Sequence, residues 1–166
     1  MERHAAVLVT GMSGVGKSTV LAELSRRGCT AVDTDDDHWL EIVDGEPLWR
    51  VPLIDQLLDQ PRATPLFVQG TVANQGHFYD RFNSVVLLSA PIDVVLDRIE
   101  KRTNNPFGKL SQQRAQILAD FAEVEPLLRQ AATHEVSTDR PLVDVVDILI
   151  EIASETASGS TAASPR

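Results

Sequence analysis

Nine residues near the N-terminus, from Gly11 to Thr19, have the types and spacing of a phosphate-binding loop. They read Gly-Met-Ser-Gly-Val-Gly-Lys-Ser-Thr and satisfy the pattern G-x-x-x-x-G-K-[ST]. In such a loop the glycines let successive main-chain N–H groups point at an anion, and the following helix presents its positive end to the same anion. The residues expected to bind nucleotide phosphates are Gly11, Ser13, Gly14, Val15, Gly16, Lys17, Ser18 and Thr19.

Two side chains of this loop have chemistry beyond phosphate binding. Lys17 would reach the β- and γ-phosphates and take part in catalysis, and the Ser18 hydroxyl would ligate Mg²⁺. A glycine-rich turn with an incidental lysine is the alternative, but an apolar strand-like run precedes the loop and a helix-like segment follows it, as the pattern requires. The sequence therefore predicts ATP, or a related nucleotide such as GTP, together with Mg²⁺ as cofactors.

Carboxylates follow the second expected strand of the chain. Residues 33–37 read Asp-Thr-Asp-Asp-Asp, and ligands of an open parallel sheet gather at the carboxyl ends of its strands. Asp33 and Asp35 occupy alternate positions, so both are expected to face the cleft. One carboxylate there could hold magnesium through water, and a second could orient or deprotonate an acceptor hydroxyl. Asp36 and Asp37 are interpreted as a solvated acidic loop.

The glycine loop and the Asp33-Thr34-Asp35 segment about fifteen residues later resemble the shikimate kinase and gluconate kinase group of small P-loop kinases. The resemblance implies that Asp33 helps to place magnesium. It also implies that Asp35 holds the acceptor hydroxyl and serves as the base. Gln69, at the end of the third strand, stands where many P-loop enzymes have a magnesium-associated Asp, which strengthens the assignment of Asp33.

The acceptor site is expected to include residues farther along the chain. Residues 45–50 read Gly-Glu-Pro-Leu-Trp-Arg, similar to elements of shikimate and gluconate kinases, and the resemblance makes Arg50 a candidate ligand of the acceptor. Thr71 and Asn74, in the loop after the third strand, could read hydroxyls of the acceptor or belong to a polar surface loop. The triple glycine of shikimate kinases is replaced here by Gly70-Thr71-Val72, so the resemblance does not extend to the substrate.

Three arginines are candidates for the nucleotide site. Arg98 and Arg102 lie four residues apart on one helix, and this pair is similar to the arginines that cover the adenine and touch the phosphates in adenylate kinase-like proteins. Arg98 is expected to bind nucleotide and Arg102 to assist catalysis; surface ion pairing is the alternative. Residues 103–110 are interpreted as a short lid. Arg140 lies where relatives hold the base.

Apolar runs and helical periods define the elements that must position these residues. The expected strands are 5–10, 30–33, 65–69, 84–89 and 134–137. The expected helices are 19–27, 92–102, 112–131, which Pro126 should kink or split, and 141–153. Alternating strands and helices predict an α/β fold with three αβα layers. The resemblance implies a P-loop fold of the nucleoside and shikimate kinase type, with a five-stranded parallel sheet in the order 2-3-1-4-5.

The chain length and composition fit one domain. The chain has 166 residues, of which 43% are apolar, and residues 1–153 are assigned to a single domain. Residues 154–166 are mostly Ser, Thr and Ala, and we expect them to be a disordered tail. The net charge of −9 argues against nucleic acid or a membrane as partner, and the single Cys29 fits a reducing compartment such as the cytoplasm. A monomer or a homodimer is expected.

Three functions remain open from the sequence. The first is a kinase that moves the γ-phosphoryl group of ATP to a hydroxyl of a small metabolite. The second is a nucleoside or nucleotide kinase, for which Arg50, Arg62 and Arg81 could bind an acceptor phosphate. The third is a nucleotide-binding module without turnover, against which the second carboxylate, Asp35, argues.

Overall fold

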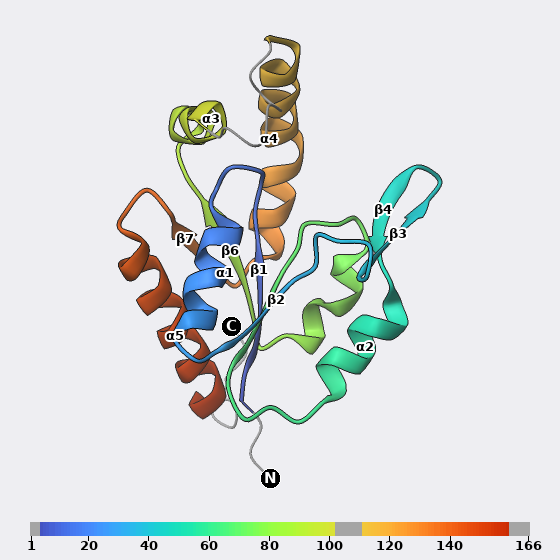
Figure 1. Cartoon of the computed structure of the whole chain (residues 1–166), viewed down its shortest axis with the longest axis vertical. Coiled ribbons are helices and arrows are strands. Elements are labelled where there is room, and N and C mark those ends of the chain that lie inside the picture. Colours follow the sequence, from blue (N-terminus) through green and yellow to red (C-terminus); the bar gives the residue numbers. More distant parts are fainter. Residues whose placement is uncertain (1–3, 102–110, 160–166) are drawn as a thin grey trace.

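A five-stranded parallel sheet forms the centre of the computed structural model, which describes residues 4–101 and 111–159. Its strands are β1 (Ala6–Thr10), β2 (Thr30–Asp33), β5 (Leu66–Gln69), β6 (Ser84–Ser89) and β7 (His134–Ser137). They lie in the order β2-β5-β1-β6-β7 (Figure 1). Numbered along the chain among themselves, these strands have the predicted order 2-3-1-4-5. The expected strand boundaries agree with the structure to within one residue.

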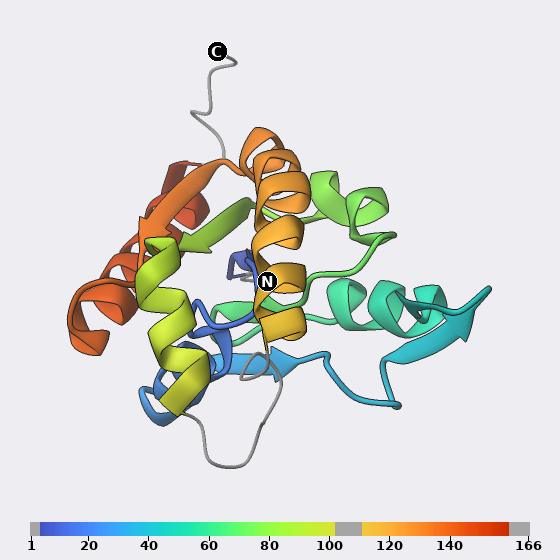
Figure 2. The same ribbon diagram turned by 90° about the horizontal axis from the view of Figure 1, so that it is seen from above.

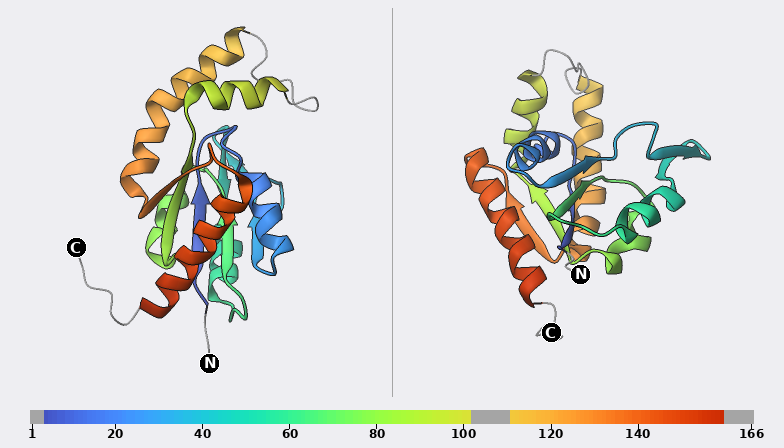
Figure 3. Two further views of the ribbon diagram at one scale, coloured as in Figure 1. Left: turned by 90° about the vertical axis from the view of Figure 1, so that its left-hand side faces the viewer. Right: turned by 60° about the horizontal axis from the view of Figure 1, so that its bottom comes forward.

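Helices cover both faces of this sheet. They are α1 (Lys17–Arg26), α2 (Val51–Asp59), α3 (Ile92–Lys101), α4 (Ser111–Ala131) and α5 (Leu142–Gly159), with a 3₁₀ helix, η1, at Gln75–Arg81. The left view of Figure 3 shows the strands between α1 on one side and α4 on the other, and α5 packs against α1. The predicted three-layer α/β fold is therefore confirmed.

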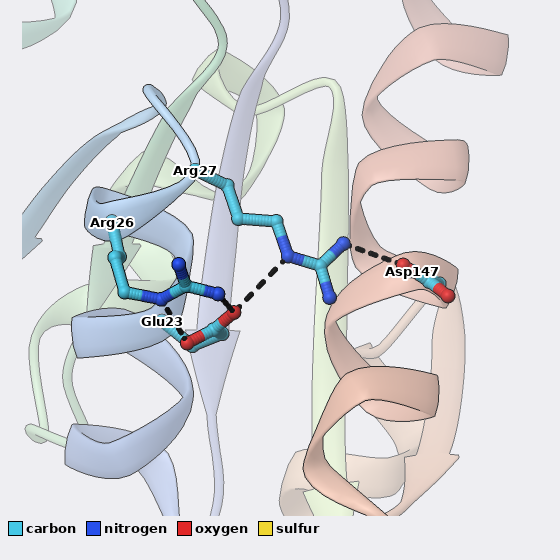
Figure 4. A network of polar contacts seen from close by, with 4 residues as sticks. All are labelled: Glu23, Arg26, Arg27 and Asp147. Carbon is cyan, nitrogen blue, oxygen red and sulfur yellow. Dashed lines mark hydrogen bonds and ion pairs between the residues drawn. The ribbon is translucent and has the colours of Figure 1, made fainter.

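Successive side chains of β1 pack in two different apolar clusters because they point to opposite faces of the sheet. On β1, Val7 and Val9 pack in the cluster that includes the buried residues of α1 and α5. Ala6 and Leu8 pack in the other, with residues of α2 and η1. Arg27 at the end of α1 also contacts Glu23 of that helix and Asp147 of α5, so an ion network joins these two helices at the surface (Figure 4).

A hairpin and a helix between β2 and β5 were not predicted. The hairpin strands β3 (Leu40–Val43) and β4 (Glu46–Trp49) pair antiparallel and stand away from the sheet (Figures 1 and 2). Their two-residue turn, Asp44 and Gly45, has φ of 54° and 80°, and Asp-Gly is a strong sequence signal for such a turn. The signal for α2 was Pro52 in the first turn of the helix.

One expected helix end needs correction, and some predicted features lie outside the described residues. Helix α5 continues to Gly159, past the expected end at residue 153, so residues 154–159 are helical where a disordered tail was expected. Helix α4 is one element across Pro126 and is not split. Arg102, the expected lid at 103–110 and the end of the chain from residue 160 lie outside the described residues. Within the described ranges, no helix has the length and apolar character needed to span a membrane.

Candidate active site

The glycine loop joins the end of β1 to the start of α1, and two of its glycines have no room for a side chain unless their neighbours shift. A Cβ on Gly11 would lie 2.6 Å from the carbonyl oxygen of Leu88 on β6. Gly14 has φ of 86°, and its Cβ would lie 2.8 Å from Val95 of α3. The loop therefore packs closely against the neighbouring strand and against α3, which an L side chain at either position would prevent.

The loop and the start of α1 form a cradle for an anion. Gly16 caps α1 without a side-chain hydrogen bond, and the first turn of the helix has no acidic residue, so the helix end keeps its positive character. The half-buried Lys17 bends back over the loop, and its Nζ donates to the carbonyl oxygens of Gly11 at 2.7 Å and Met12 at 3.1 Å. This arrangement fits the phosphate binding expected of the motif.

Thr71 braces the glycine loop. Its Oγ1 donates to the Gly11 carbonyl oxygen at 2.7 Å, lies 3.3 Å from the Gly11 amide nitrogen and is 3.1 Å from the Thr10 hydroxyl. Gln75, which is buried, donates in turn to the Thr10 hydroxyl. Because the Thr71 hydroxyl is engaged with the loop, its predicted contact with an acceptor would compete with this brace.

The carboxyl end of β2 brings the two predicted carboxylates to the loop. The Ser18 hydroxyl lies 3.4 Å from Oδ2 of Asp33, and the main-chain N–H of Asp35 donates to Oδ1 of Asp33 at 3.0 Å. Both carboxylates are exposed to solvent. Nε2 of Gln69, from the neighbouring strand β5, lies 2.6 Å from Asp33 Oδ1 and 3.0 Å from Asp35 Oδ2. These residues therefore form one cluster, as expected for Asp33 and Asp35, with Gln69 added.

The donor set fits magnesium bound together with a nucleotide. In the described part of the chain, no group of three His, Cys, Asp or Glu side chains could hold a metal ion by itself. Mg²⁺ in phosphate-transfer sites takes few protein ligands and completes its shell with water and substrate phosphates. The Ser18 hydroxyl and the Asp33 carboxylate are oxygen ligands of this kind.

Buried hydrogen bonds connect this cluster to the hairpin. The Trp49 indole N–H, at the end of β4, donates to the Thr34 hydroxyl at 2.8 Å, and that hydroxyl donates to the Gln69 carbonyl oxygen at 2.7 Å. The Asn74 side chain accepts a hydrogen bond from the main-chain N–H of Trp49 and donates one to the Trp49 carbonyl oxygen. Asn74 was expected to bind the acceptor. Its amide instead holds the main chain of the hairpin, so we leave Asn74 out of the acceptor site.

Arg50 follows the hairpin and caps α2. Its guanidinium lies 3.4 Å from the carbonyl oxygen of Asp37 and 3.9 Å from the Glu41 carboxylate. These are long contacts for a charged donor, and the side chain is 43% exposed. Arg50 thus lies beside the acidic turn with donor capacity to spare, and its role as acceptor ligand stays a prediction.

A pocket of about 220 Å³ lies between the glycine loop, α3 and the start of α5. Arg98 of α3 forms part of its wall and donates to the carbonyl oxygens of Val15 and Thr138 and to the Thr138 hydroxyl. The pocket adjoins the loop, and its walls combine apolar side chains with a few polar ones, which suits a nucleotide base. Its lining consists of Val15, Gly16, Thr19, Val20, Arg98, Thr138, Arg140, Leu142 and Val145. The structure thus puts Arg98 and Arg140 in one pocket, while Arg102 lies outside the described residues.

Comparison with known proteins supports the resemblance noted in the sequence. The AAA domain family matches residues 7–119. A shikimate kinase from Rhodopseudomonas palustris is 31% identical over 157 residues, covering 85% of this chain and 77% of that protein.

Two solved structures share the fold. A shikimate kinase from Acinetobacter baumannii, solved in complex with shikimate, matches with a TM-score of 0.64 and 20% identity over 95% of this chain and 96% of that one. A gluconokinase from Sinorhizobium meliloti matches with a TM-score of 0.57 and 19% identity over 97% and 98%. The chain therefore belongs to the AAA domain family and to the group of small P-loop kinases that contains the shikimate kinases and the gluconokinases.

Proposed function

We propose that this chain transfers the γ-phosphoryl group of ATP to a hydroxyl of a small metabolite. The observation that carries the proposal is the pair of carboxylates, Asp33 and Asp35, held by one amide next to Ser18 of the phosphate loop. A nucleotide-binding module without turnover has no acceptor hydroxyl to deprotonate. A second carboxylate at the same edge has a use when a hydroxyl must be oriented and deprotonated.

Each residue then has a separate task in the transfer. The loop amides and Lys17 hold the β- and γ-phosphates, and magnesium, when bound by Ser18 and Asp33, neutralises charge on these phosphates. The Asp35 carboxylate accepts the proton of the acceptor hydroxyl. The hydroxyl oxygen bonds to the γ-phosphorus as the bond to the β,γ-bridging oxygen breaks, and ADP leaves with that oxygen. Positioning and charge stabilisation supply most of the catalysis in such reactions.

The arginines argue for a metabolite acceptor over a nucleoside monophosphate. Arg81 pairs with Asp55 at 2.6 Å and with Asp59 at 2.8 Å. Arg62 donates to the carbonyl oxygens of His4 and Leu58. Of the three arginines that could have bound an acceptor phosphate, these two are engaged elsewhere. One arginine, Arg50, fits a single anionic or hydroxyl-rich group better than a nucleotide.

The Asp35→Asn variant tests the proposal. ADP release would be measured with sugars, sugar acids, polyols, nucleosides and nucleoside monophosphates as acceptors. With the active acceptor, kcat should fall by about a hundredfold in the variant, the usual scale for a lost general base, while calorimetry shows ATP binding close to wild type. Asp37→Asn is the matched control because Asp37 is exposed in the same loop. Unchanged kcat in Asp35→Asn would remove Asp35 from the mechanism.

A further inference from the structure

Gln69, at the carboxyl end of β5, donates from one side-chain nitrogen to both carboxylates of the cluster. The residue is fully buried, and its Nε2 lies 2.6 Å from Asp33 Oδ1 and 3.0 Å from Asp35 Oδ2. An amide NH₂ group has two hydrogens, so it can give one to each carboxylate. Gln69 is therefore a bridge between the two acids of the proposed reaction.

The main chain around Gln69 is fixed from two neighbouring strands. Asp33 and Gln69 are register partners of β2 and β5. The Gln69 carbonyl oxygen accepts from the Thr34 N–H at 3.2 Å and from the Thr34 hydroxyl at 2.7 Å. The next residue, Gly70, donates its N–H to the Val9 carbonyl oxygen of β1. A side chain on such a support keeps one geometry, which is what a preorganised site needs.

The other end of the amide is unsatisfied. Gln69 Oε1 is buried and has no hydrogen-bond partner among the described residues. Turning the amide over would set this oxygen against two carboxylates, so the chemistry of the neighbours supports the orientation. Buried polar atoms without partners are rare and costly. Methionine would fill a similar volume without that cost, so packing alone does not account for glutamine here.

We propose that Gln69 is a positioning residue that sets the separation and direction of the Asp33 and Asp35 carboxylates. The inference rests on the proposed function. A neutral donor holds two like charges together without adding a charge of its own. Without it, repulsion and solvent would turn the exposed Asp35 carboxylate away from the acceptor and loosen Asp33 next to Ser18. Gln69 would act on both the proton acceptor and the metal carboxylate.

Gln69→Met tests the inference because it keeps the shape of the side chain and removes the donor. Gln69→Glu is the second variant, and Gln56→Met, at an exposed position of α2, is the matched control. Steady-state kinetics would give kcat and KM for ATP. Calorimetry would measure binding of a non-hydrolysable ATP analogue with and without MgCl₂.

The expected result in Gln69→Met is a fall in kcat of about tenfold to a hundredfold, the range for groups that orient metal ligands, with KM for ATP near wild type. The gain in analogue affinity that MgCl₂ provides should shrink by about tenfold, while affinity without MgCl₂ is unchanged. Wild-type values for both quantities would overturn the inference. If Gln69→Met does not fold, kcat and the effect of MgCl₂ on analogue binding are measured in Gln69→Glu, and wild-type values there would overturn the inference.

The kinetic and the calorimetric measurements separate this inference from the proposed function. A wild-type protein that phosphorylates no acceptor would refute the proposed function. The effect of MgCl₂ on analogue binding would still test the positioning role of Gln69, because this binding measurement requires no turnover. A normal magnesium effect in both variants would then refute the positioning role as well.

Discussion

At the scale of single residues, Lys17 supplies the positive charge that the glycine loop holds in place. Its ammonium group is bound by two carbonyl oxygens of the loop, and a triphosphate would draw it toward the β- and γ-oxygens. We expect Lys17→Ala to abolish detectable ATP binding in a calorimetric titration. The cradle would then retain its amides without a side-chain cation to offset several negative charges.

The control for this variant is Lys101→Ala. Lys101 is 76% exposed on α3 and pairs with Asp97 at 3.0 Å, so its removal should leave the titration unchanged. If titration of Lys17→Ala with ATP released the same heat as titration of the wild type, the glycine loop would not bind the triphosphate as proposed.

The sequence was informative about residues whose role follows from a local motif. The loop from Gly11 to Thr19 and the alternation of Asp33 and Asp35 follow directly from the order of amino acids. The contacts of Gln69, Thr71 and Asn74 could not be predicted, because each joins residues on different strands or loops. Such contacts depend on strand register and side-chain conformation, which single-sequence patterns do not specify.

At the scale of elements, a buried hydrogen bond from the Trp49 indole to the Thr34 hydroxyl helps to attach the hairpin to the site. Thr34→Val would keep the volume of the side chain and leave the buried indole N–H without its acceptor. We expect the free energy of unfolding to fall by about 1–3 kcal/mol, the cost of an unsatisfied buried donor, as measured by urea denaturation.

The double variant Thr34→Val with Trp49→Phe provides the control, because it removes donor and acceptor together. If the hydrogen bond is the cause, adding Thr34→Val to Trp49→Phe should cost clearly less than adding it to the wild type. Equal costs in both backgrounds would show that Thr34 stabilises the protein in another way.

Prediction of the elements succeeded where long apolar runs met strong end signals. The strand before the loop is a continuous apolar run that ends at Gly11, and the helix after β6 begins beyond Pro91. The hairpin strands have four residues each, and most of their side chains are exposed. A short exposed strand shows little apolar pattern, so only the Asp44-Gly45 turn indicated it.

At the scale of the whole molecule, ion pairs on the helices tie stability to pH. The hydrogen bond from Arg26, with a further one from Arg27, lowers the pKa of Glu23 from 4.5 to about 2 (Figure 4). Arg129 likewise lowers the pKa of Glu135. A carboxyl group whose pKa is lower in the folded state stabilises that state above its unfolded pKa. This contribution is lost as the pH falls through the folded pKa.

We therefore expect Glu23→Gln to change how stability depends on pH. For Glu23 the contribution is complete above about pH 4.5 and declines toward pH 2. The variant should be slightly less stable than wild type at pH 7, because an ion pair with a largely exposed partner such as Arg26 contributes little, and the two proteins should converge as the pH approaches 2. Urea denaturation at several pH values measures this, with Glu123→Gln on α4 as the control because Glu123 is exposed. If the difference in stability between wild type and Glu23→Gln stayed constant across that pH range, the arginines would not lower the pKa of Glu23 in the folded protein.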